Sequence, residues 1–270
     1  MTTVEARDAF RTARVAILPI GATEQHGPHL ELRTDTAIAS RLACRLAEAL
    51  GRDAVLLPEV SYGLSEHHLD FSGTLTLRPS TLRALLLDIF ESVRVNGIQR
   101  VMVINGHGGN IDAVRLAARE ALRDLEMHVA QLMWAQLGKD VIPREAGGSW
   151  RRNHACEIET SIAMVLDDSL VRHDKIVPAQ LKSPRDAFTE PTNAYVDLPI
   201  WFDAWTASGS LGDPTRASVD RGARIIDAVA SNALAFARQF VEGRPAQKDE
   251  RSGPHASIST DSQHVMEDRS

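Results

Sequence analysis

Short apolar runs rich in valine and isoleucine alternate along the chain with longer segments of helical periodicity. The run at Val15–Ile20 precedes an amphipathic segment at residues 35–50, which stops at Gly51. The run at residues 100–106 precedes a second amphipathic segment at residues 110–125. Such runs are typical of buried strands, and a 3.6-residue period is typical of helices. The alternation therefore predicts an α/β fold with a mainly parallel sheet that helices cover on both faces.

The same pattern continues as far as Gly243. Further strands are expected at residues 54–63 and 128–137, and further helices at residues 78–97, 156–166 and 217–240. Ser80 is expected to cap the helix that ends at Gly97. Residues 1–243 show no internal repeat and predict a single domain, whereas the polar residues 244–270 contain almost no aliphatic side chain and predict a disordered tail.

Composition excludes several classes of partner. The chain has 270 residues and a net charge of -6, so it has no basic field that would hold nucleic acid or an anionic membrane. No apolar run approaches the roughly 20 residues that span a bilayer, and the first ten residues lack the pattern of a signal peptide. Cys44 and Cys156 are the two cysteines, too few for a disulfide scaffold. A cytoplasmic protein is the expectation.

Two dense polar clusters directly follow predicted strands. Glu24 and His26 follow the first strand, and Asp35 opens the next helix. His107 lies in the sequence NGHGGN after the strand at residues 100–106. Sites in open α/β sheets lie outside the carboxyl ends of the strands, and residues two apart in an extended chain point the same way. Two carboxylates and two imidazoles form a mixed set of nitrogen and oxygen donors that suits Zn²⁺, Mn²⁺ or Fe²⁺.

Each cluster also has a purely structural explanation. Asp35, taken alone, fits a helix N-cap better than a metal ligand, and Glu24 and His26 could be solvated loop residues. NGHGGN could be a glycine-rich turn or a nest of backbone N–H groups that holds an anion, although it lacks the glycine spacing of a dinucleotide fold. The residues alone leave a metal site and these structural roles open.

A third cluster surrounds His154. This histidine precedes a helix whose first turn carries Glu157 and Glu159. In the functional interpretation His154 is a general acid or base that titrates near neutral pH, and a glutamate completes a metal shell. In the structural interpretation the glutamates complement the helix dipole. Cys156 is expected to be a buried structural residue rather than an activated thiol.

Five motifs together resemble the creatininase (creatinine amidohydrolase) family. They are GATEQHGPHLELRTDT, FSGTLTLRP, VINGHGGN, HACEIETS and LGDPTRAS, and the resemblance covers residues 15–240. It implies a three-layer α/β/α fold and a centre of two divalent metal ions, with Zn²⁺ expected first and Mn²⁺ or Fe²⁺ as alternatives. It also implies a homo-oligomer, often a hexamer.

The resemblance assigns roles to individual residues. Glu24, His26, Asp35 and His107 match the family's ligand positions, and Asp35 resembles the carboxylate that bridges the two metals. A bridging carboxylate suits metals roughly 3.5–4 Å apart, which share a water that becomes hydroxide near neutral pH.

The sequence departs from creatininases proper at Gly109. Those enzymes carry a metal-binding glutamate two residues after the histidine that matches His107. We hypothesise that Glu157 replaces this ligand, with Glu159 as second choice.

A tryptophan near His154 suggests how a substrate would be covered. Trp150 lies four residues before His154, as a substrate-covering tryptophan does in creatininase. An indole over the site suits a small flat ring, and Trp134 is a candidate second wall. His29, His67 and His68 are expected to be solvated loop residues, with substrate contact as the alternative, although residues 65–74 are expected to line the pocket.

The resemblance implies an amidohydrolase that acts on a small, cyclic amide. A bridging hydroxide would attack the carbonyl carbon, His154 would protonate the leaving nitrogen, and backbone N–H groups of residues 106–109 could hold the oxyanion. The alternatives are a deformylase or peptide-cleaving hydrolase of the same family, and a non-catalytic binding module whose site has decayed at Gly109.

Overall fold

A computed structural model describes residues 1–146, 154–182 and 199–243 of the chain. Its sheet has four parallel strands in the order β2-β1-β3-β4. The strands are β1 (Val15–Ile20), β2 (Ala54–Leu56), β3 (Arg100–Asn105) and β4 (His128–Met133). The register pairs Val15 with Ala54 and Ala16 with Val101, so the two central strands are β1 and β3.

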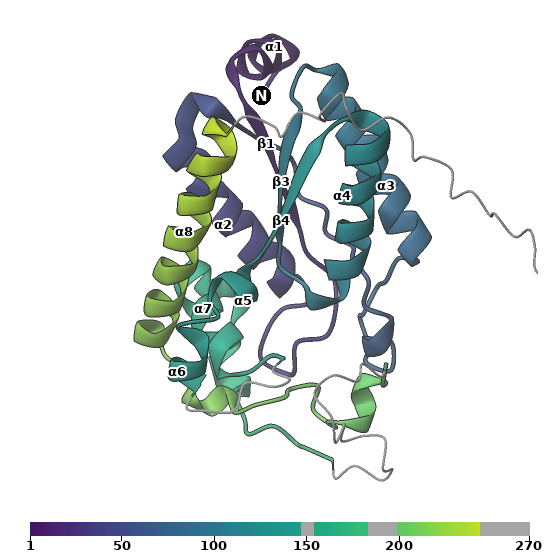
Figure 1. The fold of residues 1–270 in the computed structure, drawn as a ribbon. Helices are drawn as coiled ribbons and strands as arrows, with labels where there is room; N and C mark the ends of the chain where they lie inside the picture. The colour runs from purple at the N-terminus through teal and green to yellow at the C-terminus, as the bar shows by residue number, and fades with distance from the viewer. Residues whose placement is uncertain (147–153, 183–198, 244–270) are drawn as a thin grey trace, which may run out of the picture.

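Helices cover both faces of this sheet and make three layers, as the sequence predicts (Figure 1). One face carries α2 (Thr34–Leu50), α7 (Glu157–Leu166) and α8 (Val219–Glu242), and the other carries α3 (Pro79–Val95) and α4 (Ile111–Leu125). Alternate side chains of β1 point to opposite faces of the sheet: Ile17 packs with the first group of helices and Leu18 with the second. Burial on both faces explains why the strands read as continuous apolar runs.

Three short helices and seven 3-10 turns complete the described part of the chain. The helices are α1 (Thr3–Thr12), α5 (Trp134–Leu137) and α6 (Ile142–Ala146). The turns are η1 (Gly51–Asp53), η2 (Glu66–His68), η3 (Gly108–Asn110), η4 (Asp168–Leu170), η5 (His173–Lys175), η6 (Phe202–Ala204) and η7 (Pro214–Arg216). None of the described helices is both long and apolar enough to cross a membrane.

The structure corrects several expected boundaries. Ser80 does not cap α3, because Pro79 takes the first helical position and Arg78 precedes it as N-cap. Asp35 is not the cap of α2 either: the helix begins at Thr34, so Asp35 lies within its first turn. These two corrections leave the helices in place and free the Asp35 carboxylate for another role.

Two predicted strands are shorter than expected, and three short helices, α1, α5 and α6, were not predicted. The strand predicted at residues 54–63 ends at Leu56, and the strand predicted at residues 128–137 ends at Met133. Trp134 begins α5 there, where its indole N–H donates to the Gly106 carbonyl at 3.0 Å. Helix α1 has no fully buried residue, and its Ala9 and Phe10 are partly buried against the core on the α3 and α4 face. Its sequence signal is the capping box of Thr2 and Glu5.

The order of the strands fixes where a site can form. The chain leaves β1 toward β2 on one side, while β3 and β4 extend the sheet on the other side. The crevice between the carboxyl ends of β1 and β3 is therefore a topological switch point, where ligands bind in open α/β sheets. This is the lower end of the sheet in Figure 1.

Candidate metal centre

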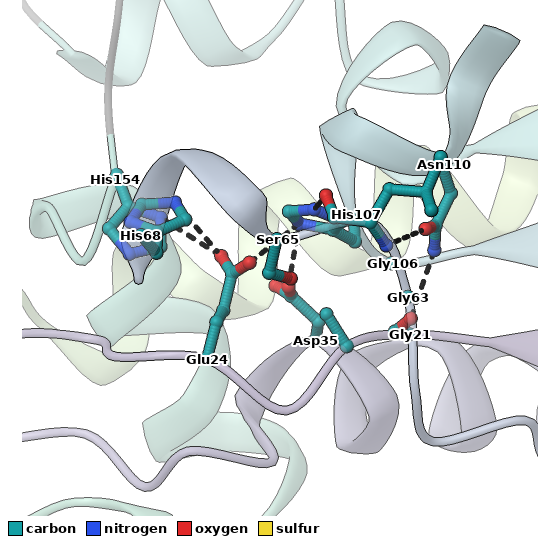
Figure 2. A network of polar contacts seen from close by, with 12 residues as sticks. Gly21, Glu24, Asp35, Gly63, Ser65, His68, Gly106, His107, Asn110 and His154 are labelled. Atoms are coloured by element: carbon teal, nitrogen blue, oxygen red, sulfur yellow. Dashed lines mark hydrogen bonds and ion pairs between the residues drawn. The ribbon is translucent and has the colours of Figure 1, made fainter. Parts of the chain in front are cut away.

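Six ligand-type side chains converge at this switch point, and all of them are buried. They are Glu24 and His26 from the loop after β1, Asp35 from the first turn of α2, His107 directly after β3, and His154 and Glu159 at the start of α7. In Figure 2 the Glu24 carboxylate lies between His68 and His154 on one side and His107 and Asp35 on the other. Segments more than a hundred residues apart in sequence thus meet within one cluster.

The carboxylates face the imidazoles at short range. Asp35 Oδ1 lies 3.2 Å from His26 Nε2, and Asp35 Oδ2 lies 3.0 Å from His107 Nδ1. Glu24 Oε2 lies 3.3 Å from His107 Nδ1, and Glu24 Oε1 lies 3.7 Å from His154 Nδ1. The two oxygens of Asp35 thus face two different imidazoles, as the bridging role implied by the resemblance would require.

Backbone carbonyls fix the tautomers of three of these imidazoles. His26 Nδ1 donates to Glu24 O at 3.2 Å, His107 Nε2 donates to Leu64 O at 2.8 Å, and His154 Nε2 donates to Gln25 O at 2.7 Å. A carbonyl oxygen only accepts, so each of these ring nitrogens carries the hydrogen and the other nitrogen of a neutral ring carries a lone pair. All three lone pairs point into the cluster, which is how metal-binding histidines are usually oriented.

These donors fit a metal centre. A lone pair of nitrogen and a carboxylate oxygen repel each other at this range unless a cation or a proton lies between them. Within the described residues, both oxygens of Glu24 and Oδ2 of Asp35 are buried without a hydrogen-bond partner. Ligand atoms of Glu24, His26 and Asp35 lie within 4.8 Å of one another, as do those of His26, His154 and Glu159. This set of nitrogen and oxygen donors suits Zn²⁺, Mn²⁺ or Fe²⁺.

Protons take the place of cations in the metal-free cluster. Burial lowers the pKa of His107, but the Glu24 and Asp35 carboxylates outweigh it and raise that pKa to about 9. Burial likewise lowers the pKa of His26, and Asp35 more than offsets this, so that the pKa rises to about 10. Burial raises the pKa of Glu24 to about 7. A cation that binds here must displace these protons.

The structure brings Glu159 into the cluster and keeps Glu157 out of it. Glu157 Oε2 accepts a hydrogen bond from the Asp213 N–H at 2.9 Å and is thereby tied to the loop before α8. Glu159 lies with His26 and His154, and its Oε2 also accepts from the Ala155 N–H at 2.5 Å. Residues two apart on a helix do not face the same way, so α7 can present only one of these carboxylates. Of the two glutamates proposed from the sequence, Glu159 thus lies with the candidate ligands, and Glu157 is held away from them.

The position of the missing glutamate is occupied by backbone. A Cβ added at Gly109 would lie 2.2 Å from the Leu64 carbonyl oxygen and 2.4 Å from His107 Nε2. The Leu64 carbonyl is the acceptor that fixes the tautomer of His107. The space at Gly109 therefore serves the orientation of His107, a candidate ligand.

A pocket of about 650 Å³ opens onto the cluster. Beside the candidate ligands it is lined by His67, His68, Trp134 and Phe202. Residues 65–74 thus contribute to the pocket as expected, but His68 is 1% exposed and is not a solvated loop residue. Trp134 forms part of the wall, and Trp150 lies outside the described residues.

His154 differs from the sequence-based expectation in its protonation, and His29 differs in its burial. Burial and the nearby His26 lower the pKa of His154 well below its usual value, so this ring is neutral rather than half-protonated near pH 7. His29 is also fully buried, and its Nε2 pairs with Thr160 Oγ1 at 2.8 Å, away from the pocket lining. The Gly106 N–H donates to Ile20 O at 2.8 Å, so it is not free to hold an oxyanion.

Two further residues support the site, and the motif-based reasoning assigned them no role. Asn110 donates to Gly21 O at 2.9 Å and accepts from the Leu64 N–H at 2.9 Å, so it joins the loops that follow three strands. Gln25 contacts both His68 and Gly209. The sequence signal for a role of these two residues was their position inside the motifs EQHG and NGHGGN.

Residues 1–237 match the sequence model of the creatininase family, described as creatinine amidohydrolase. The chain belongs to the creatininase family. The mycofactocin precursor peptide peptidase of Mycolicibacterium smegmatis is 33% identical over 229 residues, which are 83% of this chain and 84% of that protein. The creatinine amidohydrolase of Pseudomonas putida is 29% identical over 233 residues, covering 79% of this chain and 84% of its own.

Solved creatininase structures share the architecture. The structure described as "Creatininase Mn" matches with a TM-score of 0.73 and 26% identity, covering 89% of this chain and 96% of that chain. The creatininase match agrees with the three-layer arrangement and makes this chain a creatininase-family hydrolase.

Proposed function

We propose that this chain is a metal-dependent amidohydrolase whose centre holds two divalent cations, with Zn²⁺ as first candidate and Mn²⁺ or Fe²⁺ as alternatives. The residues that would hold them are Glu24, His26, Asp35, His107 and Glu159. The observation that carries the proposal is the set of imidazole nitrogens that face buried carboxylate oxygens, because both oxygens of Glu24 and Oδ2 of Asp35 have no hydrogen-bond partner in the described part of the chain. Neither a polar loop nor a helix cap requires such an arrangement.

The chemistry divides between the cations and His154. When bound, divalent cations at such a site polarise a carbonyl group and make a water nucleophilic at neutral pH. His154 presents Nδ1 to the pocket, because its Nε2–H is held by the Gln25 carbonyl. Nδ1 would accept a proton from the attacking water and pass it to the leaving nitrogen, since an amide nitrogen leaves poorly without a general acid. We thus keep the general acid role expected of His154 from the sequence, and we add that His154 first takes the proton from the attacking water.

For the substrate we retain a small cyclic amide, and from the alternatives given by the sequence we keep a peptide amide as second candidate. The cyclic amide follows from the resemblance to creatininase and from the aromatic wall at Trp134. The peptide amide is favoured by the 33% identity to a peptide peptidase over most of the chain. Both substrates present a carbonyl carbon and a nitrogen leaving group, so the same centre would serve either.

The test is hydrolysis by the metal-loaded protein. Zinc- and manganese-loaded samples are incubated with creatinine, other cyclic amides, formamides and short peptides, and products are followed by liquid chromatography and mass spectrometry. We expect turnover of at least one class, abolished by chelation and restored by the metal. A His154→Ala variant that binds the metals but shows no turnover would support the proton role. Full metal loading without hydrolysis of any amide would instead support the binding module.

The assembly belongs to the same proposal. We propose a homo-oligomer, with the hexamer of the resemblance as the expected size. Light scattering coupled to gel filtration decides this, and a monomeric mass at micromolar concentration would contradict it.

A further inference from the structure

The side-chain amide of Gln25 is held in one orientation by backbone groups. Its Oε1 accepts from the Gly27 N–H at 3.0 Å, and its Nε2 donates to the Gly209 carbonyl at 3.1 Å. An N–H group can only donate and a carbonyl can only accept, so these partners fix which end of the amide is oxygen and which is nitrogen. Gly209 has a φ of +84°, and a Cβ there would lie 2.0 Å from Gln25 Oε1. The amide is therefore clamped against backbone and cannot flip.

This clamp sets the tautomer of His68. Gln25 Nε2 also lies 2.9 Å from His68 Nδ1. The amide nitrogen is the donor in this pair, so Nδ1 is the acceptor and the hydrogen of the neutral ring is on Nε2. His68 thus has the opposite arrangement to His26, His107 and His154, which turn a lone pair inward.

The Nε2–H of His68 faces the carboxylate of the candidate ligand Glu24. Nε2 lies 3.4 Å from Glu24 Oε1, beyond the usual range for an N–H···O hydrogen bond. The ring lines the pocket and packs against both His154, at a centroid distance of 4.5 Å, and Phe202, at 4.2 Å. Although its ligand atom lies within 4.8 Å of those of Glu24 and His154, a nitrogen that keeps its hydrogen has no lone pair for a metal.

We propose that His68 donates its Nε2–H to the substrate carbonyl oxygen as that oxygen takes up negative charge, and that Gln25 is the positioning residue that keeps the hydrogen on Nε2. The inference rests on the proposed amide hydrolysis. A neutral donor that is already oriented stabilises an oxyanion without reorganisation, and the loss of one such donor typically costs about 10²–10³ in kcat. No proton leaves His68 during the reaction, because the group acts only as a hydrogen-bond donor.

Two substitutions at His68 separate a donor at Nε2 from other roles. In His68→Gln the side-chain amide nitrogen can reach the position of Nε2, whereas in His68→Asn it reaches only that of Nδ1. We expect His68→Asn and His68→Ala to lower kcat about 10²–10³-fold with KM little changed, and His68→Gln to retain clearly more activity. Metal content per chain should equal that of the wild type in all three. Equal activity of the Gln and Asn variants, or loss of a metal ion, would overturn the proposal.

The tautomer can be observed directly in the zinc-loaded protein. Long-range ¹H–¹⁵N correlation spectra of the imidazoles, with the His68 signal assigned by its loss in His68→Ala, should show the Nε2–H form. Gln25→Glu offers Nδ1 an acceptor instead of a donor and should move the hydrogen to Nδ1, with a fall in kcat like that of His68→Asn. A zinc-bound Nε2, or an Nδ1–H form in the wild type, would overturn the donor role while leaving the amidohydrolase proposal intact. Absence of any amide turnover would overturn both.

Discussion

At Gly109 there is no room for a side chain, so a third carboxylate of the cluster, beside Glu24 and Asp35, has to come from another segment. The Leu64 carbonyl occupies the space that a side chain would need, and it holds the hydrogen of His107 Nε2. A glutamate cannot be restored there by substitution alone. Glu159, from a helix that begins some fifty residues later, lies at the cluster instead.

The first prediction compares two neighbouring glycines. We expect Gly109→Ala to lower the free energy of unfolding by about 1–3 kcal/mol and to weaken metal binding, because its Cβ meets backbone and the His107 ring. Gly108→Ala is the matched control, since a Cβ there meets nothing within 4 Å. Thermal denaturation and metal content measure the two effects. Equal behaviour of the two variants would contradict this account of the site.

The second prediction separates the two glutamates of α7. Glu159→Gln should lose about one of the two ions per chain, because an amide is a weaker ligand than a carboxylate. Glu157→Gln should keep both, since Glu157 accepts from the Asp213 N–H and lies outside the cluster. Elemental analysis after dialysis against a weak chelator checks both. The reverse outcome would restore Glu157 as the ligand.

Among the helices, the contact of α7 with α8 determines where Glu159 lies. Gly222 of α8 packs directly on α7: a Cβ there would lie 1.9 Å from the Ser161 carbonyl oxygen. Just before the start of α7, Ala155 adopts a left-handed φ of 48°, and the Glu159 carboxylate accepts a hydrogen bond from the Ala155 N–H. The start of α7 is therefore held from both sides, by backbone contact and by the candidate ligand itself.

The third prediction tests this helix contact. Glycine to alanine within a helix usually gains about 1 kcal/mol, but Gly222→Ala should instead destabilise the protein by about 1–3 kcal/mol. It should also weaken metal binding, because α7 must shift to make room. Ser231→Ala, on the exposed side of α8, should be neutral or slightly stabilising. Chemical denaturation and metal titration measure the effects, and a stabilised Gly222→Ala would refute the contact.

Elements with a strong periodic signal could be predicted, and elements determined by tertiary contact could not. The strand β3 and the helix α2 follow directly from their hydrophobic patterns. The end of β4 at Met133 depends on an indole that finds a carbonyl 28 residues away, which no local pattern contains. The same holds at the site. The residues near β1 and β3 could be grouped from strand ends, whereas the choice between Glu157 and Glu159 depends on how α7 lies on α8.

At the scale of the whole molecule, the protonated cluster links stability to pH. Between pH 7 and pH 9 an unfolded histidine, with a pKa of about 6.5, has lost its proton. In the folded metal-free protein His26 and His107 keep theirs, because their pKa values rise to about 10 and about 9. The folded state then binds more protons than the unfolded state, so its stability falls as the pH rises through this window.

The fourth prediction follows from that sign. The Tm of the chelated protein should fall between pH 7 and pH 9, with a limit of about 1.4 kcal/mol per pH unit for each proton concerned. The zinc-loaded protein should show a higher Tm and a flatter dependence, because the metal has displaced those protons. Differential scanning fluorimetry at fixed ionic strength compares the two. Parallel curves would show that the cluster does not hold these protons.

The contacts of the segment around Gly209 have a consequence for synthesis of the protein. Gly209 clamps Gln25, Leu211 pairs with His154 through two backbone hydrogen bonds, and Asp213 anchors Glu157. The ribosome makes Gln25 long before these partners, so the sheet can assemble while the shell around the cluster is still open. The nascent chain therefore passes through a stage in which most of its candidate ligands are present and the contacts of residues 209–213 with Gln25, His154 and Glu157 are still missing. The shell around the cluster is then closed only after translation of this late segment.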